Sequence, residues 1–183
     1  MKYYKVLKNN GKCCNGGSGK WYLPKKLKDG TWKPGKWMPE IEGELEPCEN
    51  GYHVCRPQDL VHWLGEAIFE VQYEGEIVED DYKCVVGKAR LLRKIEAWNE
   101  KTARLFAADC AEHVLHIYEK QYPDDDRPRK AIQAARDYAN GLIDDEELKA
   151  ARAAAWEAAR AAAREAEHKW QTKKLMKYLE EAR

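Results

Sequence analysis

The sequence predicts an α+β protein, with a small mixed β-sheet unit and one short helix in residues 1–96 and a bundle of about three helices in residues 97–183. Two observations predict this division, and a third indicates the class of protein. Residues up to about 95 alternate between apolar and polar side chains and are rich in β-branched and aromatic types. After Trp98 and Asn99 the composition changes to helix-forming residues in segments that begin with cap residues. The balance of 44% apolar and 35% charged residues is typical of a globular protein.

Several classes of protein are disfavoured by composition. No apolar run approaches the roughly 20 residues of a membrane-spanning helix, and the N-terminus lacks the apolar core of a signal peptide. We therefore expect a cytoplasmic protein without a membrane partner. The six cysteines are too sparse for a disulfide scaffold, so we expect reduced thiols.

The first strand is predicted at residues 2–7 and a glycine-rich loop at residues 13–19. The loop lacks the fixed spacing of nucleotide-binding loops, which disfavours a phosphate site. Cys13 and Cys14 could join Cys48 and either His53 or Cys55 around zinc, because thiolate and imidazole are its preferred ligands. The usual gap of two to four residues inside a ligand pair is missing, so no metal site is predicted.

An extended hairpin is predicted at residues 20–39, with the Asp29-Gly30 turn at its tip and prolines that keep it at a sheet edge. Tryptophans interleaved with lysines suit single-stranded nucleic acid, whose bases stack on rings and whose phosphates attract ammonium groups. The candidates are Trp21, Lys25, Lys26, Trp32 and Trp37. The interpretation that we favour is that the tryptophans form the core and the lysines are solvated.

The centre of the first unit is residues 48–59, where a turn, a strand and a helix start follow one another. Asn50-Gly51 is a turn dipeptide, the next four residues alternate like a half-buried strand, and Pro57 opens a helix that runs to about Leu64. His53 is the one candidate catalytic side chain. Because no catalytic set is complete around it, we predict a structural role with a hydrogen-bonded imidazole.

Further strands are predicted at residues 68–74, 77–78, 83–86 and 89–95, with a turn or bulge at Gly75.

Positive and negative charges are concentrated in different segments of this unit. Residues 1–36 contain ten Lys and one Asp, whereas residues 40–82 contain thirteen acidic residues and a single Arg56. We expect the acids to form a negative face for a basic partner surface. The residues assigned to this face are Glu40, Glu42, Glu44, Glu46, Glu79, Asp80 and Asp81. The alternative is that the Lys-rich segment pairs with these acids.

Three helices are predicted in the second unit. Asn99 caps the first, Asp126 caps the second, which Gly141 ends, and Asp144 opens the third with Glu147 at capping-box spacing. The third could run to about residue 179. An apolar stripe is predicted on the first helix, formed by Leu105, Phe106, Cys110, His113, Val114 and Ile117. His113 and His116 are read as ordinary helix residues and not as a metal or acid-base pair.

The first unit resembles a small uncharacterised domain of phage and prophage proteins. The residues that carry the resemblance are the sequence from Gly51 to Asp59, with its Gly-x-His-x-Cys and Pro-x-Asp spacing, and residues 69–71, 75–77 and 89–95. The resemblance implies no activity. The order of strand, short helix and strand is also similar to part of ADP-ribosyltransferase-like domains, although a catalytic Glu is not evident.

The second unit resembles the helical putative immunity-protein family. The residues that carry this resemblance are 103–115, with Cys110-Ala-Glu-His113, and 124–132, with an Asp-Asp-Arg-Pro-Arg run, followed by an Ala/Arg-rich tail. The resemblance implies helical modules that bind toxins or other partner proteins.

These observations predict a non-enzymatic phage- or immunity-type protein that binds and inhibits or neutralises a bacterial partner protein, such as a toxin or a CRISPR effector. No cofactor is predicted. Two alternatives stay open: an ADP-ribosyltransferase-like enzyme that binds NAD with His53 in its cleft, and a module that binds nucleic acid through the Lys/Trp-rich segment.

Overall fold

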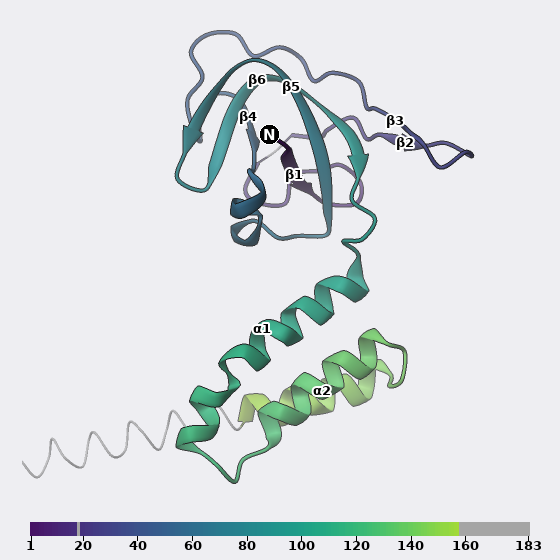
Figure 1. Ribbon diagram of the computed structural model, residues 1–183, viewed down its shortest axis with the longest axis vertical. Coiled ribbons are helices and arrows are strands. Elements are labelled where there is room, and N and C mark those ends of the chain that lie inside the picture. The colour runs from purple at the N-terminus through teal and green to yellow at the C-terminus, as the bar shows by residue number, and fades with distance from the viewer. Residues whose placement is uncertain (18, 158–183) are drawn as a thin grey trace, which may run out of the picture. The chain divides into compact units, whose positions relative to one another are not determined.

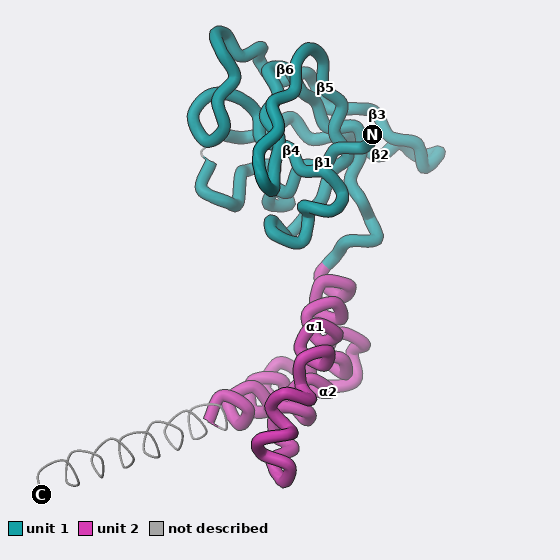
Figure 2. Tube along the Cα trace, turned by 60° about the vertical axis from the view of Figure 1, so that its left-hand side comes forward, with its two compact units in different colours: residues 1–99 teal, residues 100–183 magenta. Residues whose placement is uncertain are grey.

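The computed structural model describes residues 1–17 and 19–157 (Figure 1). The chain divides into two compact units, residues 1–99 and residues 100–183 (Figure 2). Among the residues that are described, no helix is both long enough and apolar enough to cross a membrane.

A four-stranded sheet with the order β1-β5-β6-β4 forms the first unit (Figure 1). Its strands are β1 (Tyr3–Leu7), β4 (Tyr52–Val54), β5 (Ala67–Asp80) and β6 (Lys83–Lys94). All three ladders are antiparallel, so the α+β class is confirmed while the sheet is not mixed. The segments predicted after residue 67 merge into one long hairpin of β5 and β6. The register shifts between Glu74 and Ile77, which places a bulge at Gly75, whose φ is 85°.

The sheet curls until its two edge strands meet. Tyr4 and Cys55 exchange both backbone hydrogen bonds, with N–O distances of 2.9 and 2.7 Å. Beyond the short β4, the edge of β6 is covered by an irregular segment whose amides donate to β6 carbonyl oxygens. The donors are Gly35, Met38 and Ile41. The curled sheet thereby encloses its own core.

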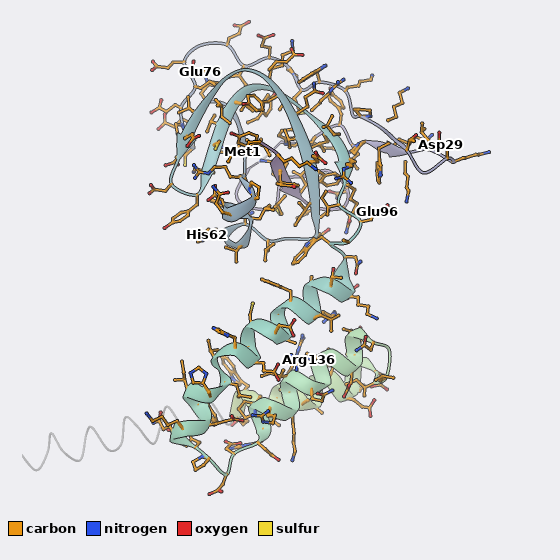
Figure 3. The ribbon with its side chains drawn as sticks, viewed as in Figure 1. Met1, Asp29, His62, Glu76, Glu96 and Arg136 are labelled. Atoms are coloured by element: carbon orange, nitrogen blue, oxygen red, sulfur yellow. The ribbon has the colours of Figure 1, made fainter. Side chains whose placement is uncertain are left out.

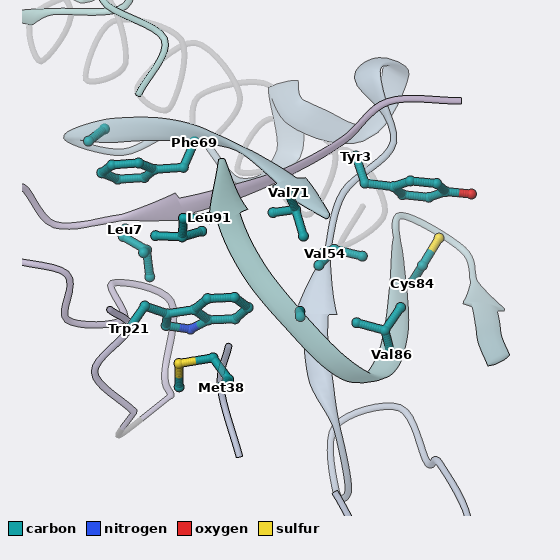
Figure 4. Close-up of a cluster of buried hydrophobic side chains, with 12 residues drawn as sticks. Tyr3, Leu7, Trp21, Met38, Val54, Phe69, Val71, Cys84, Val86 and Leu91 are labelled. Carbon is teal, nitrogen blue, oxygen red and sulfur yellow. The ribbon is translucent and has the colours of Figure 1, made fainter. Parts of the chain in front are cut away.

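The core lies inside this curl (Figure 4). Its fully buried side chains include Leu7, Val54, Val86 and Leu91, and Trp21 packs with them at 3% exposure. Side chains two apart on a strand share a face, so Tyr3 and Leu7 of β1 both reach the core. Lys5 lies between them on the same face.

A short 3-10 helix, η1 (Pro57–His62), follows β4, where the sequence predicted a short helix. Arg56, between β4 and η1, connects this junction to the end of β5 through hydrogen bonds. Its guanidinium donates hydrogen bonds to the carboxylates of Asp59 and Glu79 and to the carbonyl oxygens of Asp80 and Asp81. Asp59 is only 4% exposed, so this charge is buried with its partner.

The predicted hairpin is present as β2 (Lys25–Lys26) and β3 (Trp32–Lys33). Asp29 lies at its tip, as Figure 3 shows, and its carboxylate accepts hydrogen bonds from the amide and hydroxyl of Thr31. This is the side-chain contact that makes Asp favourable in tight turns.

The second unit contains α1 (Glu100–Gln121), α2 (Arg127–Ala139) and a third helix at residues 145–157. The capping box is confirmed, because Asp144 accepts from the Glu147 amide while the Glu147 carboxylate accepts from the Asp144 amide. Gly141 ends the second helical segment with a φ of 73°. The predicted extension of the third helix to about residue 179 lies outside the described residues after 157.

The apolar stripe predicted on α1 is not its buried face. Val114 is 51% exposed and Ile117 is 63% exposed, whereas Ala108 and Leu115 are buried, as is Leu148 of the third helix. The Arg136 guanidinium of α2 (Figure 3) reaches the carboxylates of Asp109 and Glu112, each at 2.7 Å. The face of α1 that meets α2 therefore includes acidic residues paired with Arg136. Val114 and Ile117 of the predicted stripe remain exposed.

Candidate functional site

A cavity of about 510 Å³ lies in the first unit. Its wall combines β1, the loop after Gly11, the junction before β4, the end of η1 and the start of β6. The side chains used below are Lys5, Trp21, Cys48, Tyr52, His53, Trp63 and Lys83, together with the thiols of Cys13, Cys14 and Cys55. Segments distant in the sequence are brought to one wall because the sheet curls.

Lys5 brings a positive charge into the cavity wall. Its ammonium donates a hydrogen bond of 2.8 Å to the carbonyl oxygen of His53 and lies 5.3 Å from the ring centre of Trp21. Withdrawal from water lowers the pKa of Lys5, because desolvation disfavours the charged amine. The nearby thiols act in the opposite direction and only partly compensate.

His53 is held by the backbone, as predicted. Its Nε2 accepts a hydrogen bond of 2.9 Å from the amide of Cys48. Burial lowers the pKa of His53, and the ammonium groups of Lys5 and Lys83 lower it further. The imidazole is therefore neutral at pH 7. Because Nε2 is already occupied by an amide, this nitrogen does not offer a general base to a substrate.

Cys48 has a φ of 72°, a left-handed conformation that non-glycine residues rarely adopt. Its Sγ lies 2.7 Å from the Nζ of Lys83, and this hydrogen bond raises the pKa of Lys83. The Lys83 ammonium also lies 5.8 Å from the ring centre of Trp63. Lys83 therefore links the junction before β4 to the end of η1.

Two thiols of the cavity, those of Cys14 and Cys55, are held in the protonated form. Burial raises the pKa of Cys14, and it raises the pKa of Cys55 to about 11. These two thiols are therefore poor nucleophiles at neutral pH. In the part of the chain that the structure describes, no group of three or more His, Cys, Asp or Glu side chains is placed to hold a metal ion. The zinc site considered for Cys13 and Cys14 is not assembled.

The predicted acidic face divides into two parts. Glu40, Glu42, Glu44 and Glu46 are exposed on the segment between β3 and β4. The side chain of Asn50 donates to the carbonyl oxygens of Glu42 and Glu44, which fixes the backbone of this segment. Glu40 lies 3.8 Å from Lys88. Within residues 1–17 and 19–157, the other three form no ion pair.

The second part of the face is bound into the fold. Glu79 pairs with Arg56 at 3.0 Å, and Asp80 pairs with Lys83 at 3.6 Å. The carbonyl oxygen of Asp81 also accepts from Arg56. These three residues therefore hold the β5–β6 turn against η1.

The Lys-rich segment offsets little of this acidity. Lys2 approaches Glu70 at 3.8 Å, and Lys26 pairs with Glu96, which lies outside the acidic stretch. The closer partners of the acids are Arg56, Lys83, Lys88 and Arg93, and the last three belong to β6.

The nucleic-acid candidates occupy different environments. Trp21 is in the core and has no free face for a base. Trp37 is half-buried and lies beneath the cationic groups of Lys88 and Arg90, 5.5 and 4.6 Å from its ring centre. Only Trp32, Lys25 and Lys26 belong to the hairpin, and Lys26 is paired with Glu96. The core interpretation of Trp21 is confirmed.

Sequence reasoning did not identify Lys5 as a functional residue. One signal was present in the sequence, because Tyr3, Lys5 and Leu7 alternate with the period of a strand. A lysine between two inward apolar residues is unusual, since Lys is almost never buried without a partner.

Comparison with known proteins identifies both units. Residues 93–175 match the family described as Imm-5 like putative immunity protein. Neither the curated proteins nor the solved structures include a match. Both resemblances seen in the sequence are confirmed. Residues 1–103, more than half of the 183, match the family described as Domain of unknown function (DUF7666), and the chain belongs to that family.

Proposed function

We propose that this chain is an immunity-type protein that binds and neutralises a bacterial partner protein, such as a toxin or a defence-system component. The observation that carries the proposal is the immunity-protein match over residues 93–175, which includes α1, α2 and the described part of the third helix. An immunity protein acts by occupying its partner, so this function needs a recognition surface and no catalytic group.

Glu42, Glu44 and Glu46 supply a surface suited to a basic partner. All three are exposed and, in the described structure, free of ion pairs, and the contacts of Asn50 hold their backbone in place. Carboxylates that are not neutralised within the fold create a field that steers a basic protein toward them. A basic surface that normally binds nucleic acid is a suitable target for such a row of negative charge.

The function is tested in two steps. The full chain is immobilised, proteins from a bacterial lysate are captured, and each captured protein is then expressed alone and together with the chain. We expect one captured protein to inhibit growth when expressed alone, and co-expression of the chain to restore growth. If no captured protein inhibits growth, or if co-expression never relieves inhibition, the proposal is wrong.

The acidic surface is tested on the captured partner by association kinetics. The variant Glu42→Lys/Glu44→Lys/Glu46→Lys should lower the association rate at least tenfold at low salt, and the difference should shrink at high salt because surface charges are screened. The matched control is Lys25→Glu/Lys28→Glu/Lys33→Glu, which reverses three exposed charges on the hairpin. An unchanged rate for the acidic variant would remove these residues from the recognition surface.

A further inference from the structure

We propose that the cavity of the first unit binds a small molecule that joins a phosphate or carboxylate to a planar ring, with Lys5 and Lys83 holding the anionic group. This binding site is separate from the partner recognition proposed above.

Charge is the first argument for an anionic ligand. The cavity wall contains two ammonium groups, Lys5 and Lys83, and a single carboxylate, that of Glu49. Lys83 also lies 3.6 Å from the carboxylate of Asp80, which is not part of the wall. An ammonium group has three N–H donors, and the Lys5 ammonium gives one to the carbonyl oxygen of His53. In residues 1–17 and 19–157, Lys5 has no carboxylate partner. A cation withdrawn from water is costly unless an anion compensates it.

The two ammonium groups act on one place in the cavity. The Lys5 ammonium donates to the carbonyl oxygen of His53, and the Lys83 ammonium contacts Sγ of Cys48, whose amide donates to Nε2 of His53. Both ammonium groups therefore lie close to His53, and both lower the pKa of its imidazole. Since Nε2 of His53 accepts from the amide of Cys48, the neutral ring carries its proton on Nδ1. The residues that line this wall therefore combine two cations with a neutral imidazole donor, a set that suits phosphate or carboxylate oxygens.

The strained backbone of Cys48 is consistent with a built site. Its left-handed conformation places Sγ within 2.7 Å of the Lys83 ammonium. Strained non-glycine residues persist where the surrounding structure holds them, and they concentrate at functional sites. Here the strained residue, Cys48, makes the contact that holds the Lys83 ammonium near the segment before β4.

Aromatic side chains on the same wall argue for a planar ring in the ligand. Tyr52 and Trp63 are half-buried and line the cavity, and Trp63 lies beside Lys83. The buried Trp21 supports Tyr52 edge to face, with ring centres 5.3 Å apart. Small-molecule sites are typically lined by aromatic and apolar groups with a few polar groups that orient the ligand. The volume of about 510 Å³ falls within the range of about 300–1,000 Å³ seen for such sites.

Direct binding tests the ligand class. The full chain is titrated in a calorimeter with adenosine monophosphate, with indole-3-carboxylate and with uncharged adenosine. We expect saturable binding of at least one anionic probe, and, if that probe is adenosine monophosphate, adenosine should bind at least tenfold more weakly. Tighter binding of the phosphate or of the carboxylate probe identifies the anionic group. If neither anionic probe binds saturably, or if adenosine binds as tightly as its phosphate, the proposal is overturned.

Substitution of Lys5 tests the location. Lys5→Met keeps most of the length of the side chain and removes its charged end. We expect at least a tenfold loss of affinity for the anionic probe with an unchanged or higher unfolding temperature. Lys8→Met, which removes an exposed charge just after the same strand, should leave affinity unchanged. Lys83→Met gives a second variant at the other cation, with the same expected loss. Wild-type affinity in a folded Lys5→Met or Lys83→Met variant would overturn the assignment.

Discussion

Sixteen buried apolar residues belong to the sheet unit of residues 1–99, whereas the described helices of residues 100–157 contribute three, Ala108, Leu115 and Leu148. The helices instead carry ion pairs on their facing surfaces, such as those of Arg136 and Arg129. Burial of apolar surface is largely insensitive to ionic strength, and exposed ion pairs are screened by salt. The two units should therefore respond differently to core substitutions, salt and acid.

The largest expected effect is a cavity in the core of the sheet unit. Leu91→Ala removes a side chain with 0% exposure and should lower the free energy of unfolding by about 2–5 kcal/mol. This free energy is measured by urea denaturation followed by tryptophan fluorescence. The control Val61→Ala, at a residue of the same unit that is 57% exposed, should change the free energy of unfolding by less than about 0.5 kcal/mol. Equal effects of the two variants would contradict an apolar core as the source of stability.

A smaller effect is expected where the helices meet. Arg136→Gln removes the ion pairs with Asp109 and Glu112 and should lower the unfolding temperature of the helices at low salt. In high salt the difference from wild type should narrow, since these pairs are exposed. Circular dichroism at the helical wavelengths measures the transition, and Arg152→Gln provides a control at an exposed arginine. A difference that persists in high salt would show that Arg136 acts mainly through packing.

Acid should weaken the sheet unit at a higher pH than the helices. Because the pKa of His53 is lowered in the folded state, the unfolded chain takes up the proton first, so stability falls as the pH drops below about 6.5. Asp125, in the helices, also has a lowered pKa, mainly through its hydrogen bond from Arg127. Its contribution to the free energy of unfolding is therefore lost only below about pH 3.8. His53→Gln should remove the first of these two losses.

The measurement is urea unfolding at several pH values. Tryptophan fluorescence reports mainly on the sheet unit, which contains five of the seven tryptophans, and circular dichroism reports on the helices. If the loss of stability that fluorescence detects between pH 6.5 and 5 is the same in His53→Gln as in wild type, His53 is not the cause of the earlier acid response of the sheet unit.

The smallest effect on stability is expected from the exposed acids. Glu42→Lys/Glu44→Lys/Glu46→Lys should change the free energy of unfolding by no more than about 0.5 kcal/mol per substitution, because no ion pair is lost. Glu79→Lys should destabilise the sheet unit more than any one of them, since it places a second cation against Arg56. Thermal unfolding of the four single variants makes the comparison. A triple variant that does not fold would assign these acids to the fold.

Local signals in the sequence predicted much of the fold. Asp144 and Glu147 form the capping box that their spacing indicated, and Asp29 closes the hairpin turn. The imidazole of His53 is hydrogen-bonded, although its partner, the Cys48 amide, could not be named in advance. Each of these contacts spans five residues or fewer, so the residue types and their spacing contain the necessary information.

Two features could not be predicted because they depend on distant segments. The apolar stripe predicted on α1 indicated the wrong buried face, since Ala108 and Leu115 are the buried residues and Arg136 of α2 pairs with Asp109 and Glu112. The cavity is lined by residues from Lys5 to Lys83 that meet only when the sheet curls. No local pattern shows that Cys48 and Lys83, which are 35 positions apart, come into contact.

The bridge between Tyr4 and Cys55 has a consequence for self-association. An open sheet presents unpaired amides and carbonyls at its outer strands, and these recruit strands of other molecules into aggregates. Here the two outer strands bond to each other at this bridge, and the segment that includes Met38 occupies the edge of β6 beyond β4. The small β2–β3 ladder carries Lys25 and Lys33, whose like charges repel a second copy. The sheet unit is therefore protected against growth into fibres.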